Sequence, residues 1–441
     1  METLAAYLDR KQQELTLLNS FLGTPLAMPR PVSAIEVINR KFQLAAALKA
    51  EHALHDWALT ETAWAHPTRR HAGPFKFSYD YQRADLRVSG PSFYEFDDLR
   101  TNDTIYTSSG MAAISALLLA SAQMIPSADI LALPGAYGET VELIETYAQH
   151  LRLIPLQRAP CEFATDAERP QILLFDSCTN AAAFEAALAC KTAELDLVVF
   201  DTTCFSCGSG RIRRVLSWAR RWQLPIVLVR SHTKLDSLGV EYGRLGSAVF
   251  VAGPAGAKQE RMRQLATAMR NAVRLLGGAA LPAHFPPYVG TKAYRTLTCK
   301  RVAAILRNGR RMARYFARTL PGSSAELHFA HGLYVTLAPK RRLDEQQARQ
   351  MAADLSRDLG ESGFPLRHAG SFGFDFGAAE WFHDRSRDRY AVRIAVSDLP
   401  TALWDEVTRA VFRWWSMHEE RRNHSTCDGH RDSPLRSRLR K

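Results

Sequence analysis

Two apolar segments that end in reactive side chains decide the fold of this chain: LDLVVFD at residues 195–201 and PIVLVRSHTK at residues 225–234. Each apolar run is continuous and does not alternate, which is typical of a strand covered on both faces of a parallel sheet. Similar short runs lie at residues 130–133, 153–156, 172–175 and 247–251, with helical periodicity between them. The series predicts an α/β domain built on a mostly parallel sheet.

The regions outside this series of strands show other patterns of hydrophobic residues. Residues 1–75 are predicted to form an N-terminal helical arm, and residues 76–290 the large α/β domain. Residues 291–420 are predicted to form a smaller C-terminal α+β domain. It would begin with a long helix at 294–320 and contain strands near 333–337 and 391–396 and helices near 345–359 and 401–418. Residues 421–441 form a polar, basic tail that we expect to be disordered.

The composition of the chain restricts the classes of function that it can have. The chain has 441 residues, 46% of them hydrophobic, and a formal net charge of +12. The tail carries seven basic and two acidic residues, so it supplies much of the excess positive charge. Nucleic-acid binding is disfavoured because no base-reading motif accompanies the charge. The remaining surplus could serve substrates with phosphate or carboxylate groups.

Several features favour a cytoplasmic protein. No apolar run reaches the roughly 18 to 20 residues of a membrane helix. The first residues lack the apolar core of a secretory signal. Seven cysteines, an odd number in a large chain, favour reduced thiols.

The ends of the two quoted segments carry the chemistry. Ligands of parallel sheets bind beyond the carboxyl ends of the strands, where Asp201 and Lys234 are expected. An acid that keeps a pyridine nitrogen protonated and an amine that forms a Schiff base are what a pyridoxal 5′-phosphate (PLP) site needs. The hydroxyls of Ser231 and Thr233 flank the lysine and could reach the cofactor phosphate. Lys234 and Asp201 are therefore the predicted catalytic pair.

A second candidate element is TSSGMAA at residues 107–113, between a strand-like IYT and a helix-forming run. Small residues at a helix start leave backbone N–H groups and the helix dipole available to an anion. A plain helix cap would have the same sequence, and the segment alone does not separate the two readings.

Taken in order, these motifs resemble the Cys/Met-metabolism family of fold type I PLP enzymes, the cystathionine γ-synthase and γ-lyase relatives. The resemblance spans roughly residues 77 to 397 and implies a seven-stranded type of sheet, PLP as cofactor and Tyr137 as the residue stacked on its ring. It further implies that the cofactor is bound by Ser109, Gly110, Met111, Asn180, Asp201, Thr203, Ser231, Thr233 and Lys234.

The resemblance also implies residues shared between subunits and residues for the substrate. Tyr81 and Arg83 resemble a segment that reaches the cofactor phosphate of a neighbouring subunit, so a homodimer or homotetramer is expected. Ser371 and Arg393 match the pair that clamps the substrate α-carboxylate, a task that suits the planar fork of arginine. No metal site is expected.

The chain departs from the family after the lysine, at residues 235–243, and after Ser371, at Phe374-Asp375-Phe376. These segments lie where the reaction type and the side-chain pocket are expected to be set. The resemblance favours a lyase or transferase of amino-acid metabolism that eliminates or replaces a group at Cβ or Cγ. An aminotransferase is the alternative, and a non-catalytic protein that binds through its basic tail is the second.

Two further features of the sequence are interpreted as structural. Cys204 and Cys207 could form a redox pair or half of a zinc site, but small buried residues beside the cofactor are the favoured interpretation. The arginine-rich helix at 211–222 is interpreted as a solvated face, with substrate or partner binding left open.

Overall fold

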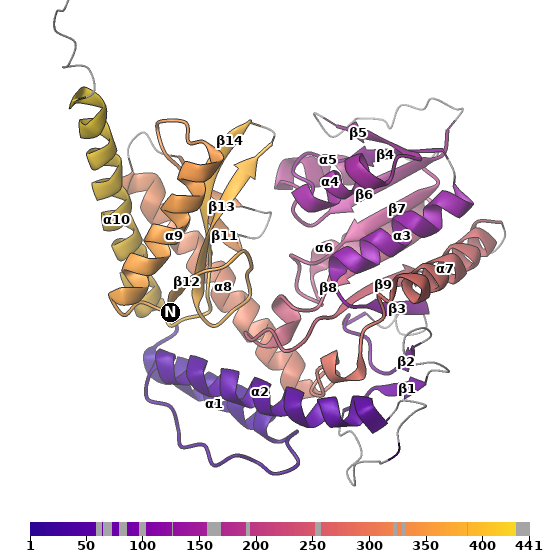
Figure 1. Cartoon of the computed structure of the whole chain (residues 1–441), viewed down its shortest axis with the longest axis horizontal. Helices are drawn as coiled ribbons and strands as arrows, with labels where there is room; N and C mark the ends of the chain where they lie inside the picture. The colour runs from indigo at the N-terminus through magenta and orange to yellow at the C-terminus, as the bar shows by residue number, and fades with distance from the viewer. Residues whose placement is uncertain are drawn as a thin grey trace, which may run out of the picture.

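The fold is described by a computed structural model covering residues 1–58, 64, 73–78, 86–96, 103–125, 127–156, 169–190, 195–251, 257–320, 324–328, 332–385 and 387–428. It consists of a helical arm, a larger α/β part and a smaller α+β part (Figure 1). No helix within these residues is long and apolar enough to cross a membrane.

The larger part is built on a seven-stranded sheet of order β3-β9-β8-β7-β6-β4-β5. β9 runs antiparallel to both of its neighbours, and the other pairs are parallel. The predicted α/β class and mostly parallel sheet are confirmed. The strands are β3 (Asp103–Thr107), β4 (Ala128–Ala132), β5 (Leu151–Pro155), β6 (Gln171–Asp176), β7 (Leu197–Asp201), β8 (Ile226–Ser231) and β9 (Gly246–Val251).

Helices cover both faces of this sheet, which explains the continuous apolar runs. Along β7, Leu197 and Val199 pack in the cluster shared with α3 (Gly110–Met124), α4 (Gly138–Tyr147) and α7 (Ala257–Leu276). Val198 and Phe200 pack on the opposite side, with α5 (Ala181–Ala189) and α6 (Gly210–Arg221). Successive strand residues point to opposite faces, so both sets must be apolar.

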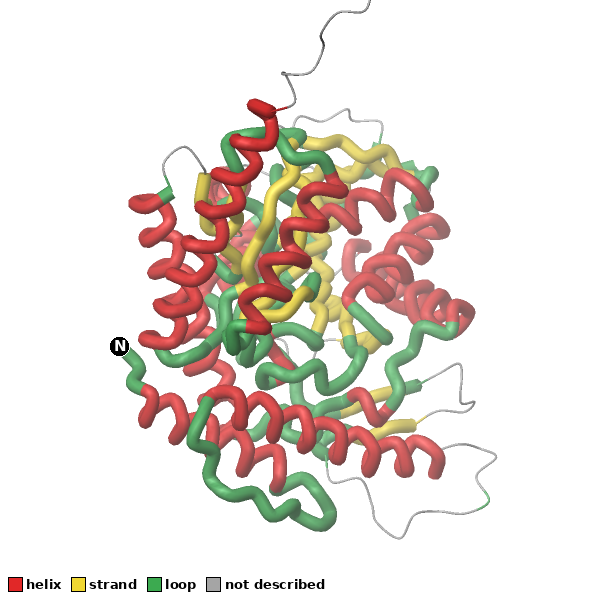
Figure 2. The backbone as a smooth tube through the Cα atoms, turned by 60° about the vertical axis from the view of Figure 1, so that its left-hand side comes forward, coloured by secondary structure: helices red, strands yellow, loops and turns green. Residues whose placement is uncertain are grey.

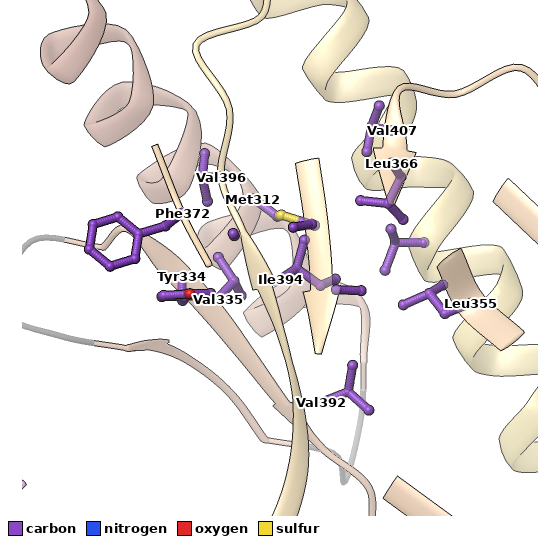
Figure 3. Close-up of a cluster of buried hydrophobic side chains, with 14 of the residues drawn as sticks. Met312, Tyr334, Val335, Leu355, Leu366, Phe372, Val392, Ile394, Val396 and Val407 are labelled. Atoms are coloured by element: carbon purple, nitrogen blue, oxygen red, sulfur yellow. The ribbon is translucent and has the colours of Figure 1, made fainter. Parts of the chain in front are cut away.

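The smaller part is a five-stranded sheet of order β10-β11-β14-β13-β12. Its core includes Val335 and Ile394 from the sheet and Leu355, Val407 and Met312 from three helices (Figure 3). The elements are α8 (Lys292–Thr319), β10 (Ser324–His328), β11 (Tyr334–Ala338), α9 (Glu345–Glu361), β12 (Leu366–His368), β13 (Gly377–Asp384), β14 (Arg389–Ala395) and α10 (Thr401–Asp428).

The last helix is longer than the sequence indicated. α10 continues through residues 421–428, into the segment expected to be a disordered tail. The rest of that tail, residues 429–441, lies outside the described residues.

The N-terminal arm consists of α1 (Leu4–Asn19) and α2 (Ala34–Ala58), which run side by side beneath the two sheets (Figures 1 and 2). It is followed by a two-stranded sheet of β1 (Lys76–Ser78) and β2 (Arg87–Ser89). Two short 3₁₀ turns, η2 (Leu235–Ser237) and η3 (Pro282–His284), complete the described elements.

A buried ion network attaches the arm to both other parts. Among the described residues it contains four basic and three acidic side chains, each 5% exposed or less. Lys11 lies 2.7 Å from both Asp375 and Asp398, and Lys41 bridges Glu14 and Asp375 at 2.5 and 2.7 Å. Burial of several charges is tolerated only where each is paired. The members are Arg10, Lys11, Glu14, Lys41, Arg301, Asp375 and Asp398.

Asp375 therefore serves this network. Within the segment 374–376, which was expected to help set the side-chain pocket, the Asp375 carboxylate is 1% exposed and bonded to Lys11 and Arg301. The network still influences the lysine segment. Lys41 donates to the carbonyl of Leu238, and the backbone N–H of Asp375 donates to the carbonyl of Gly239.

Candidate active site

The carboxyl edge of the large sheet collects the predicted acid and lysine. β6 ends at Asp176 and β7 at Asp201, and these two aspartates are register partners on neighbouring strands. β8 pairs with β7 and ends at Ser231, just before Lys234. Parallel strands thus bring Asp201 and the lysine segment to one edge, the usual place of a ligand in such a sheet.

Lys234 reaches from the large sheet to the C-terminal part. Its Nζ donates to Oγ of Ser371 at 2.6 Å. The pKa of Lys234 is lowered, chiefly because burial disfavours the charged amine, while the carboxylates of Glu241, Glu380 and Glu139 act in the opposite direction. A lysine with a lowered pKa is more readily neutral, the form that acts as a nucleophile.

The loop that carries Ser371 lies directly against the lysine backbone. Gly373 has a φ of +88°, and a Cβ at this position would lie 2.8 Å from the carbonyl oxygen of Lys234. A side chain would therefore meet both an unfavourable backbone conformation and a steric conflict. The glycine permits the close approach that places the Ser371 hydroxyl at the lysine.

Asp201 is a buried acid with few compensating donors. Its Oδ1 accepts a hydrogen bond from the backbone N–H of Thr203 at 2.7 Å, and Thr203 Oγ1 accepts one from the N–H of Ser231 at 3.0 Å. Burial raises the pKa of Asp201. Burial, followed by the charge of Asp201, raises the pKa of Asp176 to about 7. Such a pair favours a cationic group at this edge, and a protonated pyridine nitrogen satisfies that requirement.

The start of α3, where the sequence predicted an anion site, lies at this edge. Ser109 is its N-cap and accepts a hydrogen bond from the N–H of Ala112 at 3.0 Å. A Cβ at Gly110 would lie 3.0 Å from Cβ of Ser231, so the helix start lies against the end of β8. The hydroxyls of Ser231 and Thr233 are 3.0 Å apart. Amides of a helix start together with two hydroxyls are a donor set that fits a phosphate.

Met111, Tyr137 and Asn180 lie around this edge. Met111 Sδ accepts a contact from the Thr140 hydroxyl at 3.9 Å, which joins α3 to α4. Tyr137 precedes α4, and its backbone N–H donates to Asp176 Oδ2 at 2.8 Å. Asn180 is the N-cap of α5 and accepts from the N–H of Ala183 at 2.8 Å. The Asn180 oxygen therefore has a capping role in this structure.

The predicted carboxylate clamp has an unexpected partner. Nε of Arg393 donates to Oε1 of Glu380 at 2.7 Å, and the two residues face each other on β14 and β13. The guanidinium lies 4.5 Å from the ring centroid of Tyr334 and 4.9 Å from that of Phe382. Burial by itself would lower the pKa of Arg393, but Tyr334 and Glu380 outweigh it and raise the pKa overall. The guanidinium therefore keeps its charge.

Two predicted residues, Tyr81 and Arg83, lie outside the described residues. The cysteine motif does not form an internal pair, because Cys204 Sγ lies 3.7 Å from Cys178 Sγ and Cys207 Sγ contacts Glu95. No group of side chains within the described ranges could hold a metal ion. The interpretation of the motif as small buried residues agrees with this arrangement.

The sequence did not identify the residues that hold the candidate site residues in place at the carboxyl edge of the sheet. Asp176 holds the Tyr137 and Cys178 backbones, and Glu380 holds Arg393. Below Lys234, the fully buried Arg230 binds Asp236 through two bonds of 2.7 Å. A lone acid on a strand or in a short turn gives no sequence signal for such pairings.

No family model matches the chain, and no curated protein is similar to it by sequence. A solved structure is similar in fold: the cystathionine gamma synthase of Xanthomonas oryzae pv. oryzae, crystallised in complex with cystathionine. The two chains are 17% identical with a TM-score of 0.50, over 83% of this chain and 98% of that one. The chain thus shares the overall fold of that structure, and the residues at its carboxyl edge fit a PLP cofactor.

Proposed function

We propose that this protein is a PLP-dependent enzyme that acts on an amino acid. The observation that carries the proposal is the position of Lys234, whose amine lies 2.6 Å from the Ser371 hydroxyl at the carboxyl edge that also presents Asp201. A partly buried lysine with a lowered pKa and a buried acid with a raised pKa at the same sheet edge are typical of a functional site.

Each part of the cofactor has a matching group in this proposal. The first amides of α3, with Ser231 and Thr233, would hold the phosphate, and Asp201 would hold the pyridine nitrogen. Tyr137 would stack on the ring, and Asn180 would lie near its 3′-oxygen. When bound, PLP supplies an electron sink that stabilises negative charge at the substrate Cα.

The protein side chains would then bind the substrate and move its proton. Arg393, with Ser371 assisting, would hold the α-carboxylate. The neutral amine of Lys234 would take the proton from Cα and return it at Cα or at another carbon of the substrate. Because burial already favours the neutral form of this amine, Lys234 suits the role of a general base.

For the reaction type, we propose elimination or replacement at Cβ or Cγ. The likeness to a cystathionine gamma synthase favours this class, and aminotransfer is the alternative. We further propose a cytoplasmic homodimer or homotetramer in which Tyr81 and Arg83 reach a neighbouring active site.

The test is an absorbance spectrum of the purified protein with PLP. Wild type should show a visible band that Lys234→Ala lacks, and one amino acid from a panel should shift the band. Lys300→Ala, on α8, is the matched control and should keep it. A wild-type protein without a band after reconstitution would refute the proposal and turn attention to binding through the basic tail.

A further inference from the structure

Glu380 is a carboxylate inside the candidate substrate site. It faces Arg393 across the β13–β14 pair, and both side chains are only 12% exposed. The same carboxylate contributes to the raised pKa of the buried Tyr334, so the two side chains are neighbours. Glu380 is therefore fixed by two neighbours from two strands, and it is placed by the sheet and not by a loop.

The same carboxylate also lies against the loop that carries Ser371. A Cβ at Gly370, the residue before Ser371, would lie 2.9 Å from Glu380 Oε2. Ser371 in turn accepts the hydrogen bond of Lys234 Nζ. Glu380 thus contacts the candidate carboxylate clamp and the loop whose serine contacts the candidate base.

This position changes the charge that a substrate meets. Glu380 already compensates the single positive charge of Arg393, so an α-carboxylate bound there makes this group net negative, and a second substrate carboxylate would add further repulsion. Glu139 and Glu241 add carboxylates near Lys234, and no ion pair of either is found among the described residues. Once Lys234 is neutral, the site has a surplus of negative charge. Like charges brought together in such a site cost several kcal/mol, and opposite charges gain affinity.

We propose that Glu380 determines substrate specificity, selecting amino acids whose side chain carries a positive charge and rejecting acidic ones. This inference rests on the proposed function, because it assigns Arg393 and Lys234 to the substrate site. It adds the substrate class, a basic amino acid, and names the residue that discriminates.

The test uses three probes of similar length that differ in side-chain charge: L-ornithine, L-glutamine and L-glutamate. Their dissociation constants are measured from the change that each causes in the Lys234-dependent absorbance band, so turnover is not required. For wild type we expect ornithine to bind most tightly and glutamate most weakly, with at least about a tenfold difference between them.

Variants then assign the discrimination to Glu380. Glu380→Gln keeps an oxygen for Arg393 but removes the charge, and it should reduce the ornithine-to-glutamate ratio by about tenfold. Glu380→Asp keeps the charge and should retain the preference. Glu185→Gln, which removes a carboxylate from an exposed pair with Arg214, should leave all three constants unchanged.

The outcomes separate the two proposals. A missing band, or a band that no amino acid shifts, refutes the proposed function. A band that glutamate shifts at concentrations as low as ornithine overturns the charge selection alone. Equal changes for all three probes in Glu380→Gln would reduce Glu380 to a structural role. If that variant does not fold, the wild-type order of the probes still decides the substrate class.

Discussion

The buried ion network permits a quantitative prediction for Lys41→Met. Nζ of Lys41 is fully buried, lies 2.5 Å from Glu14 and 2.7 Å from Asp375, and also donates to the carbonyl of Leu238. Removing one partner of a buried pair costs about 3–5 kcal/mol, because the remaining charge is left uncompensated. Here Glu14 and Asp375 both keep Lys11 at 3.1 and 2.7 Å, and methionine fills a similar volume. We therefore expect a loss of about 3 kcal/mol, at the lower end of the range.

Urea unfolding measures this loss. The control is Arg214→Met, which removes an exposed ion pair and should cost under about 1 kcal/mol. Lys41→Met should also weaken PLP binding, because the Leu238 carbonyl belongs to the segment that follows Lys234. In the double variant Lys41→Met/Asp375→Asn, the loss should be smaller than the sum of the single losses. If Lys41→Met lowers the free energy of unfolding no more than Arg214→Met does, the ion network does not hold the arm in place.

Two further predictions concern the site itself. The folded protein keeps the Asp176 proton up to about pH 7, whereas the unfolded chain releases it near its ordinary pKa of 3.8. The free energy of unfolding of the PLP-free protein should therefore fall as pH rises through this window and level off above it. Asp176→Asn should flatten this slope in urea unfolding, and an unchanged slope would contradict the assignment. Gly373→Ala should lower both stability and PLP affinity, because the new Cβ would lie 2.8 Å from the Lys234 carbonyl. Gly363→Ala, at a φ of +85° with nothing within 4 Å, controls for the backbone strain alone and should leave PLP affinity unchanged.

Much of the large domain could be predicted from local pattern. The apolar runs that we interpreted as strands correspond to β4 to β9, and for the central strands the reason is that a strand covered on both faces is apolar along its length. The short strands β1, β2 and β12 carry no such run and were missed. The extent of α10 was underestimated because the polar composition of its last turns resembles that of a disordered tail.

At the site, the sequence indicated residue types and their order, and the structure added partners. Asp201 and Lys234 follow strands, so the rule for parallel sheets predicts that they meet at one edge. The place of Asp375 in the ion network could not be predicted, because its bonding partners, Lys11 and Arg301, lie far away in the chain. Glu380 could not be singled out, since an acid on a half-buried strand is usually solvated.

The sequence by itself thus determined the α/β architecture, the cofactor class that its motifs indicate and the lysine and acid proposed to serve it. These depend on strand periodicity and on residues that directly follow strands. Only the tertiary structure decided that Lys234 meets Ser371 and that Glu380 compensates Arg393. Such contacts depend on how two sheets and the arm pack together, and a charge buried by that packing must find its partner wherever the fold places one.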